Sequence, residues 1–566
     1  MKIIIDLQGC QLDAHRLRGI GRYSLSLIKK LIRISLNNQF ILFANGSLNN
    51  IIDCFDDELL EFDKRVSYVN WYGPSLNLKN VSNTKTRFNL AKKLRSYAIS
   101  LINGDVLLLT SFFDGYDDES VIPLDYNFNL PPVASVIYDL IPLLHPKDYL
   151  DNNLGYKRFY LNTVKELHSL DLLFTISDFA TKELINSTNI APSMISNISS
   201  GCDKKIFNTD QNFHDNYLKR RKLGNYILYC GATDSRKNLK RLLQSYSLIK
   251  NDLKIKYKLM LVGHISASAL QDIFSWQNQF DIRDDQMILM GFVPDLELAS
   301  LYRNCSLFVF PSIHEGFGLP VLEAMSCGAP VIASNQTSIP QIIGDKAYTF
   351  DPYNVKEISL LIEKSLEDNI FLNQLKSNSK SRASLFSWDI TAKCVLDELE
   401  KLSNRKNAHI INNEDWKLVV KYKKESYKSV LASLLSELKL RKEDPDFIKL
   451  AKLISTCIYL IHNEFDLELR SFEVNTKNHF NWLIEGPFDS NYSLSILNQE
   501  LALSASQNDV LDIKINITEG QGDYPINYTF LKKKPELFNL YKLSLEAGRE
   551  YFVNSRNLYP PRVNDM

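Results

Sequence analysis

Short apolar runs alternate with longer amphipathic stretches along the first 200 or so residues of the chain. Runs that are apolar at consecutive positions and rich in β-branched residues are typical of strands buried on both faces of a sheet. They occupy residues 3–5, 40–43, 106–109, 133–137 and 172–176. The alternation of buried strands with helical stretches predicts a parallel, doubly wound α/β sheet.

The same pattern starts again near Tyr226. Further strands are expected at residues 227–229, 258–262, 287–290, 307–310 and 330–333, and a helix over 388–402 closes this second part. Two Rossmann-like domains in tandem, 1–205 and 206–402, should therefore face each other across a cleft. Ligands bind such sheets at the carboxyl ends of their strands.

The last third of the chain has a different character. Residues 403–475 are rich in Lys, Glu and Leu without strand signals, which predicts a helical connector. Beyond it, a strand over 481–484 precedes Tyr492-Ser-Leu-Ser-Ile496, which repeats Tyr23-Ser-Leu-Ser-Leu27. We expect residues 476–566 to form a partial third α/β domain, the start of a second similar unit that ends before any second nucleotide site.

Composition and charge exclude several classes of protein. The 566 residues are too many for one core, and 45% hydrophobic with 23% charged residues is ordinary for a soluble globular protein. Lys+Arg and Asp+Glu both total 66, so no overall basic field would hold a nucleic acid. The eight cysteines are scattered, without the spacing of a zinc site or a disulfide framework. The first residues read as a strand rather than a signal peptide, which predicts a cytoplasmic protein.

The strongest candidate for chemistry is a strand, a glycine loop and a helix start over residues 308–325. Glu315 lies in the loop and Glu323 in the expected first helical turn, so both carboxylates should face one ligand, with one holding a ribose and the other a transferred sugar. The backbone amides that can meet hydroxyls or an anion at this helix start belong to Phe317, Gly318 and Leu319. The plainer alternative is one loop charge and one charge complementing the helix dipole.

Two further loops follow strands. The loop from Gly231 to Asn238 carries Arg236 and Lys237, adjacent cations that can neutralise a diphosphate leaving group. Its alternative is a solvated basic turn in which Asn238 caps a helix. In the first domain, Gly19 and Gly21 form Gly-x-Gly-x-x-Ser, weak as a dinucleotide fingerprint but suited to a loop whose backbone approaches a phosphate or a sugar. A plain flexible turn is the alternative there.

The order of these segments resembles glycosyltransferase family 4, of the GT-B fold, over about residues 1–402. The motifs that carry the resemblance are Gly19–Arg22, Tyr138-Asp139-Leu-Ile-Pro142, Gly231–Asn238, Glu315-x7-Glu323 and Cys327-Gly-Ala-Pro-Val-Ile-Ala333. The sequence looks most like mannosyltransferases that build bacterial O-antigen and other surface polysaccharides, in which two or more such units are often fused. The resemblance implies retaining transfer of a hexosyl group, mannose favoured, from a nucleotide-sugar, GDP-mannose favoured, to a glycan or lipid-linked glycan.

The resemblance also assigns roles to residues. Glu315 would contact the transferred sugar, and Glu323 the ribose. The remaining matches are Arg236 and Lys237 on the diphosphate, Gly19 and Gly21 on phosphates or acceptor, and Phe292 and Val293 against the base. The family often has His-Asp where this chain has Tyr138-Asp139, and an unperturbed phenol titrates at about 10. Asp139 is therefore the candidate that orients the sugar or shares the acceptor proton, with an Asp that caps a turn as the alternative.

Three rival functions remain open to the sequence. A non-catalytic nucleotide-sugar-binding remnant of a truncated fusion would need neither glutamate nor Lys237. A nicotinamide oxidoreductase would carry the full glycine fingerprint, which this chain lacks. A metal-dependent transferase would show Asp-x-Asp at a strand end, but Asp444-Pro-Asp446 lies in the connector, so we expect no metal and no other cofactor.

A basic stretch over residues 85–97 borders an apolar stripe. It suggests peripheral contact with the inner face of the plasma membrane, where a lipid-linked acceptor would lie. The alternative is a solvated helix that covers its own sheet.

Overall fold

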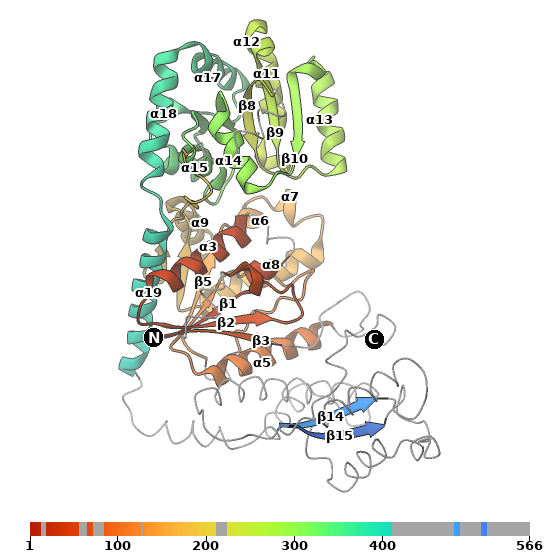
Figure 1. The fold of residues 1–566 in the computed structure, drawn as a ribbon, viewed down its shortest axis with the longest axis vertical. Helices are drawn as coiled ribbons and strands as arrows, with labels where there is room; N and C mark the ends of the chain where they lie inside the picture. The colour runs from red at the N-terminus through yellow and green to blue at the C-terminus, as the bar shows by residue number, and fades with distance from the viewer. Residues whose placement is uncertain are drawn as a thin grey trace. The chain divides into compact units, whose positions relative to one another are not determined.

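The computed structural model describes residues 1–12, 19–55, 65–71, 84–125, 128, 130–210, 223–409, 480–486 and 511–517. The chain forms two compact units, Met1–Asp466 and Leu467–Met566. The first unit contains two parallel sheets, each flanked by helices (Figure 1). The predicted pair of doubly wound Rossmann-like domains is confirmed.

The first sheet has seven parallel strands in the order β3-β2-β1-β4-β5-β6-β7. The strands are β1 (Lys2–Asp6), β2 (Gln39–Asn45), β3 (Val66–Trp71), β4 (Val106–Leu109), β5 (Val133–Ile137), β6 (Leu172–Thr175) and β7 (Ile195–Asn197). The five strands expected from the sequence are all present. The prediction missed β3 and β7, because each mixes polar with apolar residues and is only partly buried.

Helices cover both faces of this sheet. They are α1 (Gln8–Gln11), α3 (Gly19–Ile34), α5 (Thr84–Ile102), α6 (Ile141–Leu144), α7 (Pro146–Tyr149), α8 (Leu154–Glu166) and α9 (Asp178–Thr188), with 3-10 turns at Ile52–Cys54, Leu167–Ser169 and Pro192–Met194. Side chains of β1 alternate between two cores, since Ile3 and Ile5 pack with α3 while Ile4 packs with α5.

The basic stretch lies on α5. Its apolar side chains, including Leu90 and Leu94, are buried in the core, and Lys92 and Lys93 form ion pairs with Glu166 and Asp125. The helix therefore covers its own sheet, and its apolar stripe is not available for contact with a membrane. Among the described helices, none is both long enough and apolar enough to cross a bilayer.

The second sheet has six parallel strands in the order β10-β9-β8-β11-β12-β13. Its strands are β8 (Asn225–Cys230), β9 (Tyr257–Val262), β10 (Met287–Gly291), β11 (Leu307–Phe310), β12 (Val331–Ser334) and β13 (Thr349–Phe350). All five predicted strands are present, and β13 is too short to give a sequence signal. The order reverses between β8 and β11, which makes that point the expected ligand site.

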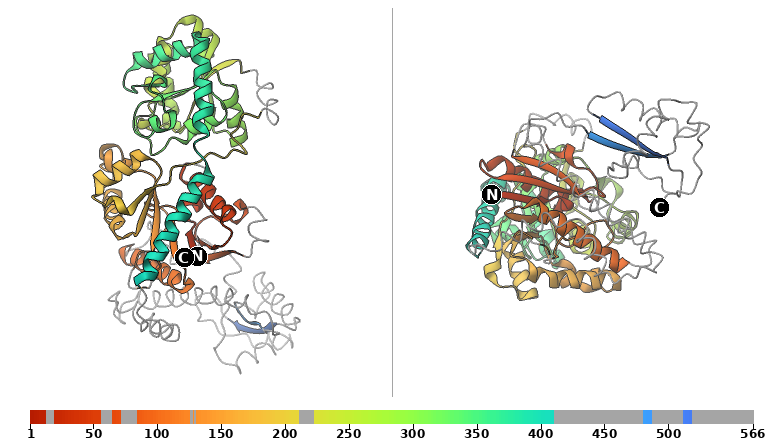
Figure 2. Two further views of the ribbon diagram at one scale, coloured as in Figure 1. Left: turned by 90° about the vertical axis from the view of Figure 1, so that its left-hand side faces the viewer. Right: turned by 90° about the horizontal axis from the view of Figure 1, so that it is seen from below.

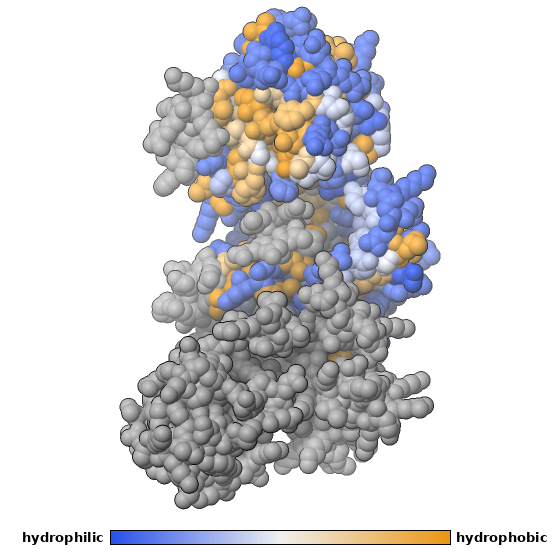
Figure 3. Space-filling view, turned by 90° about the vertical axis from the view of Figure 1, so that its right-hand side faces the viewer, coloured by the Kyte–Doolittle hydropathy of each residue, from blue (hydrophilic) through white to orange (hydrophobic). Residues whose placement is uncertain are grey.

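Eight helices accompany these strands in the described residues. They are α11 (Leu239–Leu248), α12 (Asn251–Lys256), α13 (Ala267–Gln279), α14 (Asp295–Asn304), α15 (Leu319–Ser326), α16 (Ile339–Ile343), α17 (Val355–Glu367) and α18 (Asn369–Ala383), with 3-10 turns at Ser235–Lys237, Asp284–Gln286 and Lys346–Tyr348. Figure 3 shows apolar surface gathered on one side of this domain.

The predicted helix over 388–402 is present as α19 (Trp388–His409), but instead of closing the second domain it returns to the first and lies beside α3 (Figure 2). Lys30 of α3 pairs with Asp389 at 2.6 Å. A Cβ on Gly201 would lie 2.2 Å from the backbone nitrogen of Trp388. Only glycine therefore fits where the two segments that join the domains touch.

The described part of the second unit is one pair of parallel strands. β14 (Phe480–Gly486) contains the predicted strand and pairs with β15 (Leu511–Ile517), from Phe480 opposite Leu511 to Gly486 opposite Ile517. The predicted connector beyond His409 and the repeat at Tyr492 lie outside the described residues.

Candidate functional site

Two loops meet at the point where the strand order of the second sheet reverses. The loop after β8 carries Arg236 and Lys237 on a 3-10 turn, and the loop after β11 carries Glu315. Asn238 links the loops, since its amide donates to the carbonyl of Pro311 at 3.1 Å. Asn238 has a left-handed φ of 62° and makes no side-chain cap bond to α11, so the helix-cap alternative is wrong.

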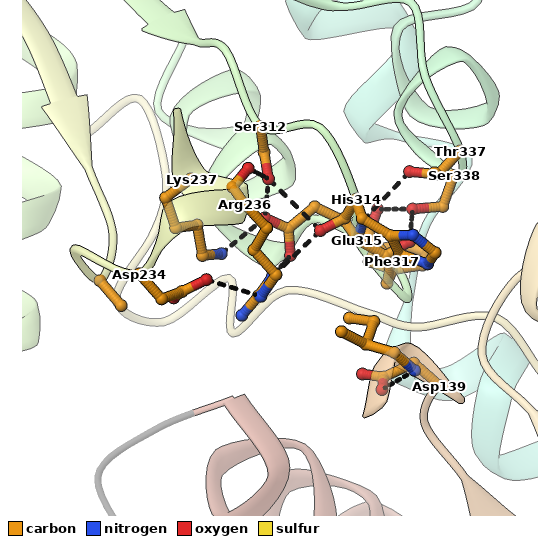
Figure 4. Close-up of polar contacts among 12 residues, drawn as sticks. Asp139, Asp234, Arg236, Lys237, Ser312, His314, Glu315, Phe317, Thr337 and Ser338 are labelled. Atoms are coloured by element: carbon orange, nitrogen blue, oxygen red, sulfur yellow. Dashed lines mark hydrogen bonds and ion pairs between the residues drawn. The ribbon is translucent and has the colours of Figure 1, made fainter. Parts of the chain in front are cut away.

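Glu315 is the centre of the polar contacts drawn in Figure 4. Its Oε1 lies 2.5 Å from Nζ of Lys237 and accepts a hydrogen bond of 2.6 Å from Oγ of Ser312, while Oε2 lies 3.1 Å from Nη1 of Arg236. The Glu315 residue is only 8% exposed. Burial raises the pKa of its carboxyl, but the two cations and Ser312 outweigh burial and lower that pKa to about 2. Glu315 is therefore ionised at neutral pH.

The guanidinium of Arg236 is held from several directions. Its Nε contacts Asp234 at 2.9 Å, and its Nη1 donates to the carbonyl of His314 at 3.0 Å in addition to Glu315. Lys237 is 7% exposed, and its Nζ lies 5.3 Å from the ring centre of Phe310. Arg236 and Lys237 thus meet two carboxylates, Glu315 and Asp234, at this corner of the site, and the N–H groups of the two cations are the donors that suit an anionic group.

Asp139 reaches the same corner from the first domain. A Cβ on Gly316 would lie 3.2 Å from Cβ of Asp139 and 2.4 Å from the carbonyl oxygen of Tyr138, so a glycine is needed where the loops approach. Burial raises the pKa of Asp139, against the opposing effects of the Ile141 amide and Arg236. Its Oδ1 accepts from that amide at 3.1 Å, so the predicted turn-capping contact is present as well.

Tyr138 is engaged within the first domain. Its hydroxyl lies 2.7 Å from Oγ of Ser24 and donates to the carbonyl of Thr110 at 3.0 Å. Burial raises the pKa of this phenol well above its usual value. Tyr138 therefore keeps its proton and supports the start of α3.

Glu323 belongs to a separate group of contacts. Its Oε1 lies 2.8 Å from Nη2 of Arg22, and its Oε2 accepts a 3.3 Å hydrogen bond from the hydroxyl of Tyr302. Arg22 also contacts Asp295 at 3.3 Å. Burial raises the pKa of Glu323, opposed by Arg22 and assisted by Asp295. The two glutamates thus have different partners, and Glu323 is the fifth residue of α15 rather than part of its first turn.

Gly19 and Gly21 were predicted to lie in a loop, but both are helical, so that prediction is wrong. Helix α3 begins at Gly19, because the amphipathic pattern that buries Tyr23 and Leu27 extends back through both glycines. A side chain at Gly19 would meet no atom within 4 Å. The helical first turn is what directs Arg22 toward Glu323. Sequence analysis quoted Arg22 within a motif but gave it no role.

The other predicted residues fall into three groups: buried side chains, one exposed ring, and residues at the ends of elements. Val293 and Phe317 are buried, and the Phe317 ring packs edge-on against Phe386 with centroids 5.7 Å apart, so their side chains belong to the core. Phe292 is 60% exposed, directly after the edge strand β10. The residues that end or begin elements near the site are Gly231, whose amide donates to Val262 at 3.0 Å, Gly318, with φ of 114°, and Leu319. Leu319 lines a cavity of about 360 Å³ together with Arg22 and Glu323.

Three side chains that were not predicted from the sequence, those of His145, His314 and Glu183, form a row of contacts between the two domains. Nδ1 of His314 lies 3.1 Å from Nε2 of His145, and Nε2 of His314 lies 2.9 Å from Oε1 of Glu183. The second contact lacks hydrogen-bond geometry. Burial and His314 lower the pKa of His145. The position of His314 directly before Glu315 was the available signal.

Comparison with known proteins gives a consistent result. A family model described as "Glycosyl transferases group 1" matches residues 210–382. The Escherichia coli serotype-specific mannosyltransferase WbdA is 32% identical over 414 residues, which are 71% of this chain and 48% of WbdA. The chain thus spans about half the length of that relative. The E. coli O-antigen chain mannosyltransferase B is 31% identical over 405 residues, 69% of this chain and 97% of that protein.

Solved structures share the fold of the first unit. Anabaena HepE, in complex with UDP and glucose, aligns over 71% of this chain and all of its own with a TM-score of 0.53 and 16% identity. The lipopolysaccharide glycosyltransferase WaaG aligns over 70% of this chain and 99% of its own, with a TM-score of 0.51 and 12% identity. At these identities the likeness concerns the fold alone.

Proposed function

We propose, from the premise that this chain belongs to the group 1 glycosyltransferases, that it transfers a hexosyl group, with mannose favoured, from a nucleotide-sugar to a growing surface glycan with retention of configuration. The observation that carries the proposal is the buried contact of Glu315 with Arg236 and Lys237 where the strand order reverses. Relatives named as mannosyltransferases and matched at 31–32% identity support mannose, and hence GDP-mannose, as the donor.

The proposed chemistry uses the N–H groups of Arg236 and Lys237 to stabilise the departing diphosphate. The bond between the anomeric carbon and the phosphate oxygen breaks, and its electron pair goes to that oxygen beside Arg236 and Lys237. The acceptor hydroxyl attacks the same face of the sugar and gives its proton to the leaving phosphate. Glu315 contacts the transferred sugar while it holds Lys237, and Asp139 orients the sugar from the other domain. In this proposal no divalent ion is needed.

The remaining proposed roles are those that the family resemblance implies. Glu323 binds the ribose hydroxyls once Arg22 shares or releases its carboxylate, and Phe292 lies against the base. Val293, Phe317, Gly318 and Leu319 contribute backbone groups, as does Gly231. The first turn of α3, with Gly19 and Gly21, borders the phosphates. We further propose that residues 1–205 bind the acceptor, that 206–402 bind the donor, and that the connector 403–475 and the partial unit 476–566 are dispensable for donor chemistry.

The direct test is a donor screen with the purified chain. Incubation with GDP-, UDP- and ADP-hexoses, with and without a mannose-terminated acceptor, should give transfer from GDP-mannose that survives excess chelator. NMR of the product should show the donor's anomeric configuration. An inverted product, or activity that depends on added Mg²⁺ or Mn²⁺, would contradict the mechanism. Binding of a sugar nucleotide without any transfer or hydrolysis would favour the non-catalytic alternative.

A chain that ends at Ser403 tests the domain proposal. It should bind the donor as tightly as the full chain does. A shortened chain that folds normally but no longer binds any donor would place the C-terminal residues in the active enzyme.

A further inference from the structure

The first sheet has its own point of strand-order reversal, between β1 and β4. The rule that places ligands at the carboxyl ends of strands beside such a point therefore applies to this sheet too. The loop after β4 begins Thr110-Ser-Phe-Phe-Asp-Gly-Tyr-Asp-Asp-Glu-Ser120. It combines aromatic rings with four acidic residues and contains no Lys or Arg.

This loop is rigidly anchored. Asp118 accepts hydrogen bonds from the amides of Gly115 and Ser120, at 3.1 and 2.7 Å, and closes the turn. Gly115 has φ of 102°, and a Cβ there would lie 2.5 Å from the carbonyl oxygen of Ser120, so the turn needs glycine. Gln8, the first residue of α1, accepts from the amide of Val121 at 2.9 Å. The tip of the loop is thus fixed relative to the sheet.

The tip packs against the start of α8 through a row of aromatic rings. At the inner end, Phe113 stacks on the buried Tyr160 with centroids 4.8 Å apart. At the outer end, the half-buried rings of Tyr116 and Tyr156 lie 5.2 Å apart, tilted by 58°. The Tyr116 hydroxyl donates to Asn153 at 2.9 Å. The inner pair belongs to the core, whereas the outer pair remains accessible.

Carboxylates surround the outer pair. Asp114 and Asp117 flank Tyr116 within the loop, and burial together with the negative charges of Asp114, Asp139 and Asp117 raises the pKa of Tyr156. Asp139 is the residue that approaches Gly316 in the loop of Glu315. Because β4 and β5 are adjacent parallel strands, the loop after β4 and Asp139 after β5 leave the same edge of the sheet, and the aromatic pair therefore lies on the side of the first domain that approaches the candidate site.

Rings and carboxylates together suit a neutral sugar. The CH groups of a pyranose pack on aromatic rings, and its hydroxyls donate to carboxylate oxygens. The loop's four acidic residues, with no Lys or Arg among them, disfavour a phosphate or another anion beside Tyr116. We propose that Tyr116 and Tyr156, with Asp114 and Asp117, bind the terminal uncharged sugar of the acceptor and present its hydroxyl to the donor. This inference rests on the proposed transferase function.

The test separates acceptor binding from donor chemistry. Tyr116→Ala and Asp117→Asn should each raise the KM for a mannose oligosaccharide acceptor by about tenfold, while hydrolysis of the donor in water without acceptor stays unchanged. Tyr257→Ala is the matched control, because Tyr257 is a half-buried tyrosine of the second domain that begins β9, at the end of the sheet opposite to the carboxyl ends of its strands. Thermal unfolding of each variant checks that the fold is intact.

A second readout needs no donor. In saturation-transfer NMR, wild-type protein should bind an α-mannose trisaccharide, and Tyr116→Ala should weaken that signal. Unchanged KM and unchanged signal, or equal losses of transfer and donor hydrolysis, would overturn the inference. A wild-type chain that binds the trisaccharide at this loop yet never uses a sugar nucleotide would instead overturn the proposed function.

Discussion

The regions around Glu315 and Glu323 differ although both glutamates are buried and both contact cations. The pKa of Glu315 falls to about 2 because Lys237 and Arg236 more than offset its burial. The pKa of Glu323 rises because burial, with Asp295 close by, outweighs Arg22. The number of cations facing each carboxylate thus determines the direction of the shift.

The source of the cations differs as well. Arg236 and Lys237 come from the same domain as Glu315, so that group is assembled within the second domain. Arg22 comes from the first domain, 301 residues away in sequence from Glu323. The first group should therefore act as a fixed part of the site, and the second should depend on how the two domains meet.

The largest expected effect is on stability. Glu315→Gln should lower the free energy of unfolding by about 3–5 kcal/mol, because it leaves Lys237 buried without its counter-charge. Glu323→Gln should cause no such loss, since the raised pKa of Glu323 makes its ionised form unfavourable and Arg22, whose side chain is 30% exposed, keeps Asp295. Urea unfolding followed by circular dichroism measures both. Equal losses would mean that the two groups do not differ, and Lys237→Met added to Glu315→Gln should recover most of the first loss.

The next effect concerns rate. Lys237→Ala should reduce turnover about a hundredfold or more, on the order of 3 kcal/mol of transition-state stabilisation, because it removes one of two charges that face the leaving diphosphate. The matched control is Lys240→Ala, which removes an exposed cation three residues further on. Steady-state transfer assays at saturating donor decide this prediction. Similar rates for the two variants would show that Lys237 does not stabilise the transition state.

The two glutamates should change the pH dependence of the free energy of unfolding in opposite directions. A depressed pKa in the folded state stabilises the protein above the ordinary value of 4.5, and this contribution disappears as the pH falls from 4.5 to about 2. Glu315→Gln should therefore flatten that acid loss by about 2–3 kcal/mol. A raised pKa acts in reverse, so Glu323→Gln should relieve a cost present above pH 4.5. Unfolding curves measured across pH 2–7 give the free energy of unfolding of each variant. A change in the same part of the pH range, below or above 4.5, for both variants would contradict this prediction.

The smallest effect is on donor affinity. Glu323→Gln should weaken binding of the sugar nucleotide by about 1.5–3 kcal/mol, since a charged hydrogen bond to ribose is lost. Calorimetric titration with GDP-mannose gives the Kd directly. An unchanged Kd would leave Glu323 as a structural partner of Arg22 only.

The fold could be predicted because buried strands leave consecutive apolar residues in the sequence. Two of the strands that were not predicted lack such runs. β3 mixes polar and apolar residues in Val66-Ser-Tyr-Val-Asn-Trp71, and β13 has only two residues. The meeting of Arg236, Lys237 and Glu315 followed from strand order, since adjacent parallel strands end at the same edge of a sheet.

Contacts between the domains could not be predicted in the same way. The pairing of Arg22 with Glu323 depends on how two separately patterned sheets face each other, which no local sequence pattern encodes. The helical start at Gly19 ran against the weak helix propensity of glycine, because packing of Tyr23 and Leu27 overrode it. His314 and Glu183 met for the same tertiary reason.

The pair between Arg22 and Glu323 also has a consequence for cooperativity. A ribose that takes the Glu323 carboxylate competes with an intramolecular partner, whose effective concentration is set by the fold. Linkage requires the effect to be reciprocal, so donor binding loosens this contact by the same factor that the contact weakens donor binding. Substitutions far from the nucleotide that tighten the junction of the two domains should therefore lower the enzyme's affinity for its donor.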